Sequence, residues 1–401
     1  MLRTSAVAAV LIAAGVSLFV PAAWAGANGQ GAAPSRETLA QRAKKAEATQ
    51  FRFDLAKSGF NPRETVLSVK NVAKLAKTWS APTKAPIYST PAVVDGVVYV
   101  GSEDDKLYAF DAKKGTQLWT ATTGGQILSS PAVSNGTVYV GSADDKLYAF
   151  DTATGAQVWV SAATGAGIDS SPAVYKGTVY VGSLDGKTYA FNAATGAPVW
   201  TSIAANKGIE DSPAIAGGIV YIGSLDGQVY AFDAQTGAKV WIAATTAPIY
   251  STPTIYQGAV YVGSTDKSVY AFDAKTGAKI WSVATAGDLW GSQAIDNGVI
   301  YLTSGTGGYF AYALDASNGS VIWQSTAFVG ELGSPPALAN GVLYFGSKDK
   351  NMYALDAATG AQLWSFTTGN QVIGGPTVVN GMLYVGSTDH SLYAFSVKKK
   401  K

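Results

Sequence analysis

Apolar and polar positions alternate over short runs through most of the chain, and the runs come in sets of four. One set reads ILSSPAV, TVYVGS, KLYAFD and QVWV, with residues that alternate or are β-branched and aromatic. Such runs predict β-strands. The set recurs at intervals of 40 to 42 residues, and a tryptophan marks its end at eight positions: Trp79, Trp119, Trp159, Trp200, Trp241, Trp281, Trp323 and Trp364. This period predicts a fold built from repeated units.

The turns between the runs predict antiparallel pairing. Pairs that favour type I′ hairpins, in which both central residues need a positive φ, separate the first and second strands: Asp95-Gly96, Asn135-Gly136, Asn297-Gly298, Asn340-Gly341 and Asn380-Gly381. An aspartate that we interpret as a turn former recurs between the second and third strands, at positions 104, 144, 185, 226, 266, 349 and 389. Eight units of four antiparallel strands predict an all-β fold, an eight-bladed β-propeller.

The two ends of the repeat region are incomplete in complementary ways. The strand that contains Trp79 has no blade before it, and the last unit, VIGGPTV through SLYAFSV, lacks its tryptophan-bearing fourth strand. We expect these two parts to form one blade and close the ring, because closure removes exposed strand edges. The propeller is therefore predicted to occupy residues 51–397.

The first 25 residues have the features of a signal peptide for export. Arg3 supplies a positive charge, residues 6–20 are apolar, and Ala23-Trp24-Ala25 fits the small-residue cleavage rule. The apolar run is short for a membrane anchor. Residues 26–50 form a polar lead-in, partly helical or disordered, and residues 398–401 form a lysine tail.

Composition narrows the class of protein further. The 401 residues are 47% hydrophobic and include 45 glycines and no cysteine, which allows a large core with many turns but neither disulfides nor a lipid-bearing N-terminal cysteine. The formal net charge is +2, so no electrostatic argument favours nucleic acid. We expect a soluble monomer that is periplasmic or secreted and that has no membrane span after the signal peptide is cleaved.

One run in each repeat carries a family resemblance. Residues 149–159 read AFDTATGAQVW, which resembles the tryptophan-docking motif AxDxxTGxxxW of quinoprotein-type (PQQ-binding-like) β-propellers. The motif recurs before four further tryptophans, and in one of these copies Asn192 replaces the Asp. In two other repeats Lys114 and Asn318 replace the Thr. The resemblance covers most of the chain from about Phe51. It implies indoles packed between blades, and it is shared by pyrroloquinoline quinone (PQQ) dehydrogenases and by BamB-type outer-membrane assembly lipoproteins.

Resemblance to the dehydrogenases would further imply long insertions around the cofactor, an adjacent-cysteine disulfide and an acidic base beside calcium. This chain has no cysteine and almost no insertions, and the acids expected near one end of the axis are Asp169, Glu210, Asp211 and Asp288. We therefore expect no cofactor and no catalysis, with a PQQ-dependent oxidoreductase that binds quinone and calcium as the alternative. His390, the only histidine, is interpreted as a solvated turn residue.

The stretch GIEDSPAI and its counterparts keep one frame but vary at one position. Around the ring that position is Tyr88, Leu128, Asp169, Glu210, Tyr250, Trp290, Gly333 and Ile373. Because this stretch leads into the innermost strand of each blade, we predict that it lies at a mouth of the central channel. The predicted ligand-binding residues are Tyr88, Asp169, Glu210, Asp211, Tyr250 and Trp290.

Two questions stay open at this point. Asp169, Glu210 and Asp211 are candidate ligands of a weak cation site, or they are hydrated, with Lys207 nearby. The repeat around Trp290 departs most from the pattern, either because the rim is modified there or because a tolerant loop has drifted. The sequence predicts a binding or scaffold module that takes a small molecule, a protein or a peptide at a propeller face.

Overall fold

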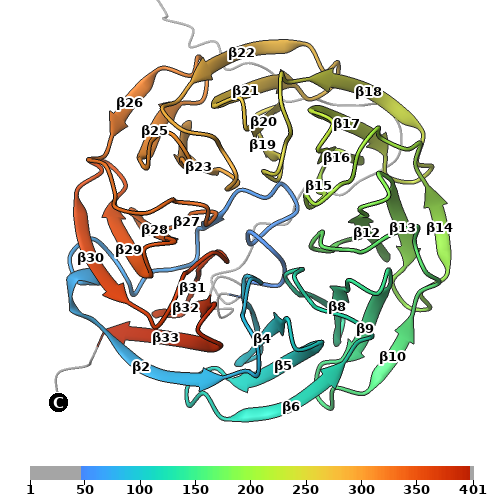
Figure 1. The fold of residues 1–401 in the computed structure, drawn as a ribbon, viewed down its shortest axis with the longest axis horizontal. Coiled ribbons are helices and arrows are strands. Elements are labelled where there is room, and N and C mark those ends of the chain that lie inside the picture. Colours follow the sequence, from blue (N-terminus) through green and yellow to red (C-terminus); the bar gives the residue numbers. More distant parts are fainter. Residues whose placement is uncertain (1–46, 398–401) are drawn as a thin grey trace, which may run out of the picture. The chain divides into compact units, whose positions relative to one another are not determined.

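Each predicted set of four runs forms one antiparallel sheet, and eight sheets surround a central axis (Figure 1). The computed structural model describes residues 47–397. The predicted signal peptide (1–25), lead-in residues 26–46 and the lysine tail (398–401) lie outside the described residues. The prediction of an all-β, eight-bladed propeller is confirmed.

The strands run from the axis outwards in each blade. Blades 1 and 2 consist of β3 (Ala92–Val94), β4 (Val97–Ser102), β5 (Lys106–Asp111) and β6 (Gln117–Thr122), and of β7 (Ala132–Ser134), β8 (Thr137–Gly141), β9 (Leu147–Asp151) and β10 (Gln157–Val160). Blades 3 and 4 consist of β11 (Ala173–Tyr175), β12 (Thr178–Gly182), β13 (Thr188–Asn192) and β14 (Pro198–Thr201), and of β15 (Ala214–Ala216), β16 (Ile219–Gly223), β17 (Gln228–Asp233) and β18 (Lys239–Ala244).

The second half of the ring has the same order. Blades 5 and 6 consist of β19 (Thr254–Tyr256), β20 (Ala259–Gly263), β21 (Ser268–Asp273) and β22 (Lys279–Ala284), and of β23 (Ala294–Asp296), β24 (Val299–Thr303), β25 (Ala311–Asp315) and β26 (Val321–Gln324). Blades 7 and 8 consist of β27 (Ala337–Ala339), β28 (Val342–Gly346), β29 (Asn351–Asp356) and β30 (Gln362–Thr367), and of β31 (Thr377–Val379), β32 (Met382–Ser387), β33 (Ser391–Val397) and β2 (Leu75–Pro82).

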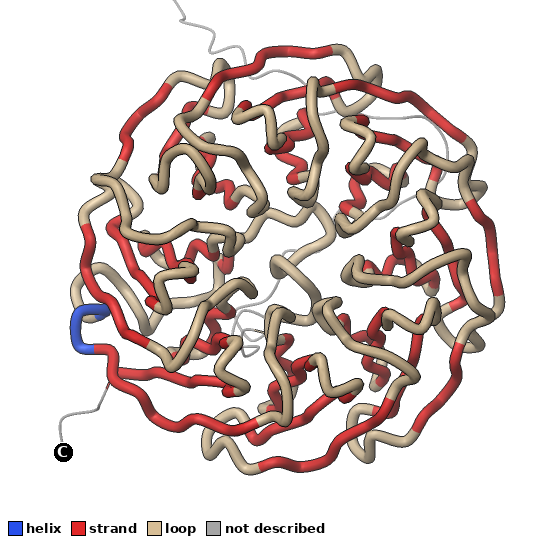
Figure 2. Tube along the Cα trace, in the orientation of Figure 1, coloured by secondary structure: helices blue, strands red, loops and turns tan. Residues whose placement is uncertain are grey.

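The eighth blade closes the ring as predicted. Strand β2 pairs antiparallel with β33, and Trp79 lies opposite Ala394. The single turn of 3-10 helix η1 (Val72–Lys74), blue in Figure 2, precedes β2. The predicted type I′ hairpins are also present, since Asn135 and Gly136, for example, have φ of 49° and 76°. Local turn chemistry and strand pairing thus agree throughout the ring.

The tryptophan of each outer strand packs on the next blade. A β-bulge precedes Trp159, whose Nε1 donates to the carbonyl of Ala193 at 3.0 Å. Gly196 of the next motif has a φ of +71°, and a Cβ there would lie 2.6 Å from the Trp159 ring. The motif therefore needs glycine for its backbone conformation and for the close approach of the indole. These contacts make the outer strands a continuous girdle.

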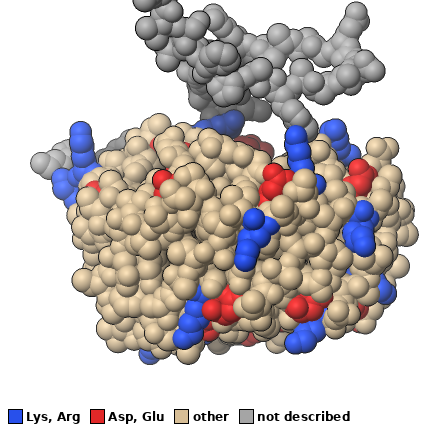
Figure 3. Space-filling view, turned by 90° about the horizontal axis from the view of Figure 1, so that it is seen from above, with Lys and Arg blue, Asp and Glu red and all other residues tan. Residues whose placement is uncertain are grey.

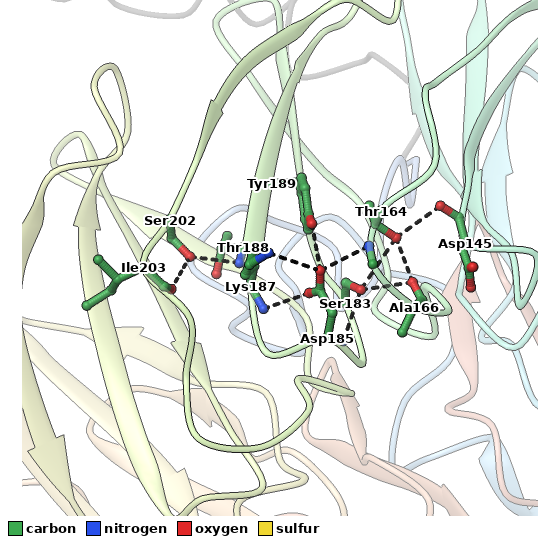
Figure 4. Close-up of polar contacts among 11 residues, drawn as sticks. Asp145, Thr164, Ala166, Ser183, Asp185, Lys187, Thr188, Tyr189, Ser202 and Ile203 are labelled. Carbon is green, nitrogen blue, oxygen red and sulfur yellow. Dashed lines mark hydrogen bonds and ion pairs between the residues drawn. The ribbon is translucent and has the colours of Figure 1, made fainter.

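The recurring aspartates do more than form turns. Asp185 accepts hydrogen bonds from the backbone N–H of Lys187 at 2.9 Å and from the Tyr189 hydroxyl at 2.6 Å (Figure 4). It also accepts from the N–H of Gly165, in the loop that enters the blade, at 3.0 Å. This aspartate thus ties a hairpin to a connecting loop, a structural role that the turn prediction described only in part.

Residues 48–61, here called the axial strap, cross the centre of the ring (blue in Figure 1). The strap follows the blades in order and offers its carbonyl groups to amides of the innermost strands: Thr49 to Val133, Leu55 to Ile215, Ala56 to Ile255, Ser58 to Ile295 and Gly59 to Leu338, at 2.6 to 2.8 Å. It ends in β1 (Phe60–Asn61), parallel to β27. The sequence did not predict this plug, whose isolated bridge from Ala48 to Val93 joins it to the first blade.

Charged side chains are sparse and of mixed sign on the edge of the ring seen in Figure 3. Ion pairs among residues 47–397 include Lys146–Asp144, Lys187–Asp185 and Lys348–Glu331. In this part of the chain no helix has the length and apolar character needed to cross a membrane.

Candidate functional site

A cavity of about 180 Å³ opens at one end of the axis, beneath the loops that lead into the innermost strands. All six predicted ligand-binding residues line it: Tyr88, Asp169, Glu210, Asp211, Tyr250 and Trp290. In each loop the preceding aliphatic residue, such as Ile168 or Ile209, is fully buried and anchors the turn. The structure thus brings the predicted residues together, while their role in binding a ligand remains a prediction.

A second ring of hydroxyl groups lies just inside the rim. The Ser171 hydroxyl accepts from the N–H of Ser130 at 2.9 Å, and the Ser212 hydroxyl accepts from the N–H of Ser171 at the same distance. The same link joins blade 5 to blade 6, from the N–H of Thr252 to the Ser292 hydroxyl. These hydrogen bonds fix the spacing of neighbouring blades, so the rim residues project from a rigid frame.

Asp169 and Glu210 are the acids of the rim, on blades 3 and 4. Asp169 is half-buried and Glu210 is exposed. Burial raises the pKa of Asp169, and burial together with the nearby charge of Asp169 raises the pKa of Glu210. No residue in the range 47–397 gives either carboxylate a hydrogen bond or an ion pair, and Lys207 is not paired with them. The two acids are therefore close, and their charge is not compensated by the protein.

Asp211 has a different environment from the other two acids. It is 2% exposed, and its carboxylate accepts from the N–H of Ser212 at 2.5 Å and of Gly223 at 2.7 Å. Burial raises its pKa well above the usual range of a carboxyl group. Five other blades have serine at this position, and the hydroxyl of Ser129, for example, bonds both the N–H and the carbonyl of Gly141. Asp211 thus occupies a backbone-binding position of the repeat.

The candidate cation site was predicted from three acids that have different partners. No group of three or more His, Cys, Asp or Glu side chains among residues 47–397 could hold a metal ion. Asp211 is engaged with backbone amides, while Asp169 and Glu210 are free at the rim. A metal site formed by all three remains a prediction to which the arrangement gives no support.

The aromatic part of the rim belongs to blades 5 and 6. The rings of Tyr250 and Trp290 have centroids 4.2 Å apart and an interplanar angle of 32°. Burial raises the pKa of Tyr250, and the charge of Glu210 adds to this rise, which places the acid near the phenol. Of the unusual residues of blade 6, Thr303 donates its hydroxyl to the carbonyl of Ser334, and Gln293 accepts from Arg52 through its backbone carbonyl.

Near the rim at blade 7, a lysine is paired with an acid. Lys348 Nζ lies 2.7 Å from the Glu331 carboxylate. Burial raises the pKa of Tyr88, Glu103 raises it further, and Lys348 opposes this rise. Gly333 leaves space beside Lys348, since a Cβ there would come no closer than 3.9 Å to another atom. The rim is therefore acidic and aromatic on blades 3 to 6 and open on blade 7.

The strap forms the floor of the cavity, which the sequence did not reveal. Phe51 lines the cavity, and the fully buried Lys57 donates to the Phe51 carbonyl at 3.2 Å. Burial lowers the pKa of Lys57 to about 7, against the attraction of Asp54, and lowers that of Arg52 to about 9. Two basic residues in a segment without repeats were the only sequence signal of this floor.

His390 has no part in this site. It is exposed, lies at a turn with a φ of 68°, and donates its backbone N–H to the carbonyl of Ser387 at 3.2 Å. The interpretation as a turn residue is confirmed.

Comparison with known proteins gives one family match. The sequence profile described as "Outer membrane protein assembly factor BamB" matches residues 64–212, 184–326 and 307–400. No curated protein matches the chain.

Similar solved structures include proteins of two kinds. A europium-containing methanol dehydrogenase superposes with a TM-score of 0.78 at 15% identity, over 90% of this chain and 100% of that one. BamB from Moraxella catarrhalis has a TM-score of 0.70 at 21% identity, over 82% and 99%. Quinohemoprotein alcohol dehydrogenase from Comamonas testosteroni has a TM-score of 0.77 at 18% identity, over 90% and 82%. At these identities the likeness concerns the fold alone.

Proposed function

The chain belongs to the family of the outer membrane protein assembly factor BamB, and from this premise we propose that it is an exported, non-catalytic binding or scaffold module. Its ligand or partner binds at the axial cavity. Export to the periplasm is part of the proposal, since residues 1–25 have the pattern of a signal peptide.

The observation that carries the proposal is the distribution of variation around the ring. The frame of the rim loops hardly changes, and residues such as Ile168 and Ile209 are buried alike. The next position varies from acid to aromatic to glycine, and seven of its eight occupants line one cavity. An invariant frame that presents a varied concave surface is how repeat proteins carry binding specificity.

The alternative function, a PQQ-dependent oxidoreductase, needs a site for a polyanionic quinone and calcium. The residues do not fit that group. The cavity of about 180 Å³ is smaller than the roughly 300–1,000 Å³ of common ligand pockets, and the strap residue Phe51 forms its floor. Its free charges are the carboxylates of Asp169 and Glu210, whereas Lys348 is paired with Glu331. The lining thus repels a polyanion at the place where a quinone would have to bind.

The proposal is tested by closing the cavity at the position with free space. Gly333→Trp adds an indole at the one rim position that has no side chain and does not itself line the cavity, and a Cβ there would come no closer than 3.9 Å to another atom. Val329→Trp is the matched control, since Val329 is 89% exposed and does not line the cavity. Both variants should keep the wild-type melting temperature.

The readout is native mass spectrometry of each protein after incubation with envelope extract. Wild type and Val329→Trp should retain the same small molecule or polypeptide, and Gly333→Trp should lose it. Equal retention by all three proteins would show that the cavity is not the binding surface. Addition of PQQ with calcium gives a second check, in which stoichiometric uptake of the quinone chromophore would contradict the non-catalytic assignment.

A further inference from the structure

We propose that the axial cavity binds a small organic cation, an ammonium group carried either by a free amine or by a lysine side chain of a partner protein. This inference rests on the function proposed above and names the chemistry of the ligand. The inference has three parts: the lining contains an open aromatic pair, it contains two carboxylates without counter-charge, and it contains no lysine or arginine among the described residues.

The aromatic pair is the first part. Trp290 is 38% exposed and lies against Tyr250, whereas Trp159 and Trp200 of the outer girdle are 8% and 9% exposed. An indole that packs a girdle has both faces covered by protein, but this indole presents ring surface to the cavity. The negative face of an aromatic ring attracts a cation, and tryptophan does so most strongly.

A glycine of the same blade, Gly305, leaves space beside Trp290. Gly305 follows Ser304, and at this position the seven other blades carry Glu103, Ala143, Leu184, Leu225, Thr265, Lys348 and Thr388. A Cβ at Gly305 would lie 2.6 Å from Asp288 Oδ1 and 3.2 Å from Trp290 Cδ1. A side chain at Gly305 would therefore clash with Asp288 and crowd the indole, so glycine leaves room for both side chains.

The carboxylates are the second part. Ring order places Asp169, Glu210, Tyr250 and Trp290 on four successive blades. The charge of Glu210 acts on the Tyr250 hydroxyl, and that of Asp169 acts on Glu210. Since no side chain among residues 47–397 pairs with either acid, a cation beside Tyr250 would gain both their attraction and the aromatic faces.

The third part excludes other ligand classes. Lys348, outside the cavity lining, is held by Glu331 at 2.7 Å, and no lysine or arginine among residues 47–397 lines the cavity, so the described lining offers no positive charge to an anion. A divalent metal needs several oxygen ligands, and the described residues contain no group of three acids or histidines that could supply them. The small volume, about 180 Å³, and the apolar floor at Phe51 suit a compact group with methylene or methyl surface.

The test titrates the purified protein with choline and with its uncharged isostere 3,3-dimethylbutan-1-ol by calorimetry at low ionic strength. Choline should bind at least about tenfold more tightly than the isostere, because only the charge differs. Trp290→Leu and Glu210→Gln should each weaken choline binding about tenfold. Glu103→Gln, a matched control on blade 1 that removes an acid outside the cavity lining, should change it less than about twofold.

Folding of each variant is checked by its melting temperature, and Trp290→Phe keeps the test valid if Trp290→Leu fails to fold. Trp290→Phe should retain part of the affinity, since phenylalanine attracts cations less strongly than tryptophan. A second arm uses a blocked pentapeptide with a central lysine and its glutamine counterpart. Preference for the lysine peptide over choline assigns the group to a protein partner, and the reverse preference assigns it to a free amine.

Two results would overturn the inference. One is equal affinity for choline and the isostere, or no affinity for choline or the lysine peptide. The other is tight binding of calcium or magnesium that Glu210→Gln abolishes, which would make the site a metal site. The proposed function is judged separately, because Gly333→Trp can abolish retention of an uncharged ligand even when no organic cation binds.

Discussion

The outer girdle repeats the same residues and contacts from blade to blade, whereas the axial rim carries different residues at equivalent positions. At the girdle, Trp159 and Trp200 make the same contacts, since each indole donates to a carbonyl of the next blade at 3.0 Å. At the rim, equivalent positions carry residues as different as Asp169, Tyr250 and Gly333. The two regions belong to the same repeats, so the period alone does not explain the difference.

The difference follows from what each region contacts. A girdle residue contacts the equivalent residue set of the neighbouring blade, so the same steric requirement recurs at each interface. A rim residue faces an open axis, and below it the strap presents different residues to different blades, such as Thr49 to blade 2 and Leu55 to blade 4. Repetition is therefore required at the girdle and is not required at the axis.

Deleting the N-terminal part should have the largest effect and separates the two regions. A chain that lacks all residues up to 82 loses β2, leaves β33 unpaired and should aggregate without a cooperative melt. A chain that lacks only the residues up to 61 loses the strap but keeps β2, and it should melt cooperatively at a lower temperature. Calorimetric scans of both proteins check this; cooperative melting of the longer deletion would contradict closure by β2.

Two glycine substitutions compare steric requirements directly. Gly237 and Gly258 have φ of +72° and +81°, and a Cβ at Gly237 would lie 2.6 Å from the Trp200 ring, whereas one at Gly258 would meet nothing within 4 Å. Gly258→Ala should cost only the backbone strain of about 1–2 kcal/mol. Gly237→Ala should cost about 1–3 kcal/mol more, because the rigid indole must move.

Urea denaturation gives the two free energies of unfolding. Since both substitutions share the positive φ, their difference isolates the contact with the indole. Equal losses at the two positions would mean that the girdle tolerates displacement of the tryptophan.

The sequence predicted the girdle and the rim, but it did not predict the floor. Type I′ turns at residues such as Asn135 and the closing strand at Trp79 depend on local chemistry that a single repeat displays. The rim positions followed from the period, because the periodic frame identified a position that varies strongly beside a buried aliphatic residue. The strap has no counterpart in any repeat, so no internal comparison could reveal that Arg52 and Lys57 are buried at the axis.

The environment of Asp211 was also beyond the sequence. Its neighbour Glu210 is exposed at the rim, and adjacent acids in a loop gave no reason to treat them differently. The structure separates them because Asp211 occupies the position at which Ser129 and its equivalents bind the backbone of a glycine. Side-chain direction within the turn, rather than spacing along the chain, decides which acid can meet a ligand.

Lys57→Met should raise stability near neutral pH by about 1–4 kcal/mol, because a buried ammonium is replaced by an apolar side chain of similar shape. In the folded protein the pKa of Lys57 is lowered from 10.5 to about 7. Between these two values the unfolded chain binds more protons, so wild-type stability rises with pH across this range. The gain from Lys57→Met should therefore be largest below pH 7 and shrink as the pH rises towards 10.5.

Melting temperatures of wild type and variant between pH 6 and 10 measure this difference. Lys74→Met, at an exposed position, is the control and should follow the wild-type profile. A constant gap between wild type and Lys57→Met across that range would show that Lys57 is not charged and buried as the structure indicates.

Asp211→Ser should have the smallest effect. It restores the serine that five other blades carry at this position. The serine hydroxyl can bond both backbone groups of Gly223, as Ser129 does with Gly141. Because the folded pKa of Asp211 is raised above 3.8, its contribution to stability is present below that pH and is lost as the pH rises. Asp211→Ser should therefore match wild type near pH 3 and exceed it by about 1 kcal/mol at pH 7.

Combining this change with Lys57→Met tests whether the buried acid and the buried base act together. Each influences the pKa of the other, but in both cases burial is the larger cause and the partner's charge is the weakest. A double-mutant cycle should thus give a coupling energy of no more than about 1 kcal/mol at pH 7. A larger coupling would mean that Asp211 departs from serine in order to hold the strap, and the rim would then be linked to its floor by an ion pair rather than by packing alone.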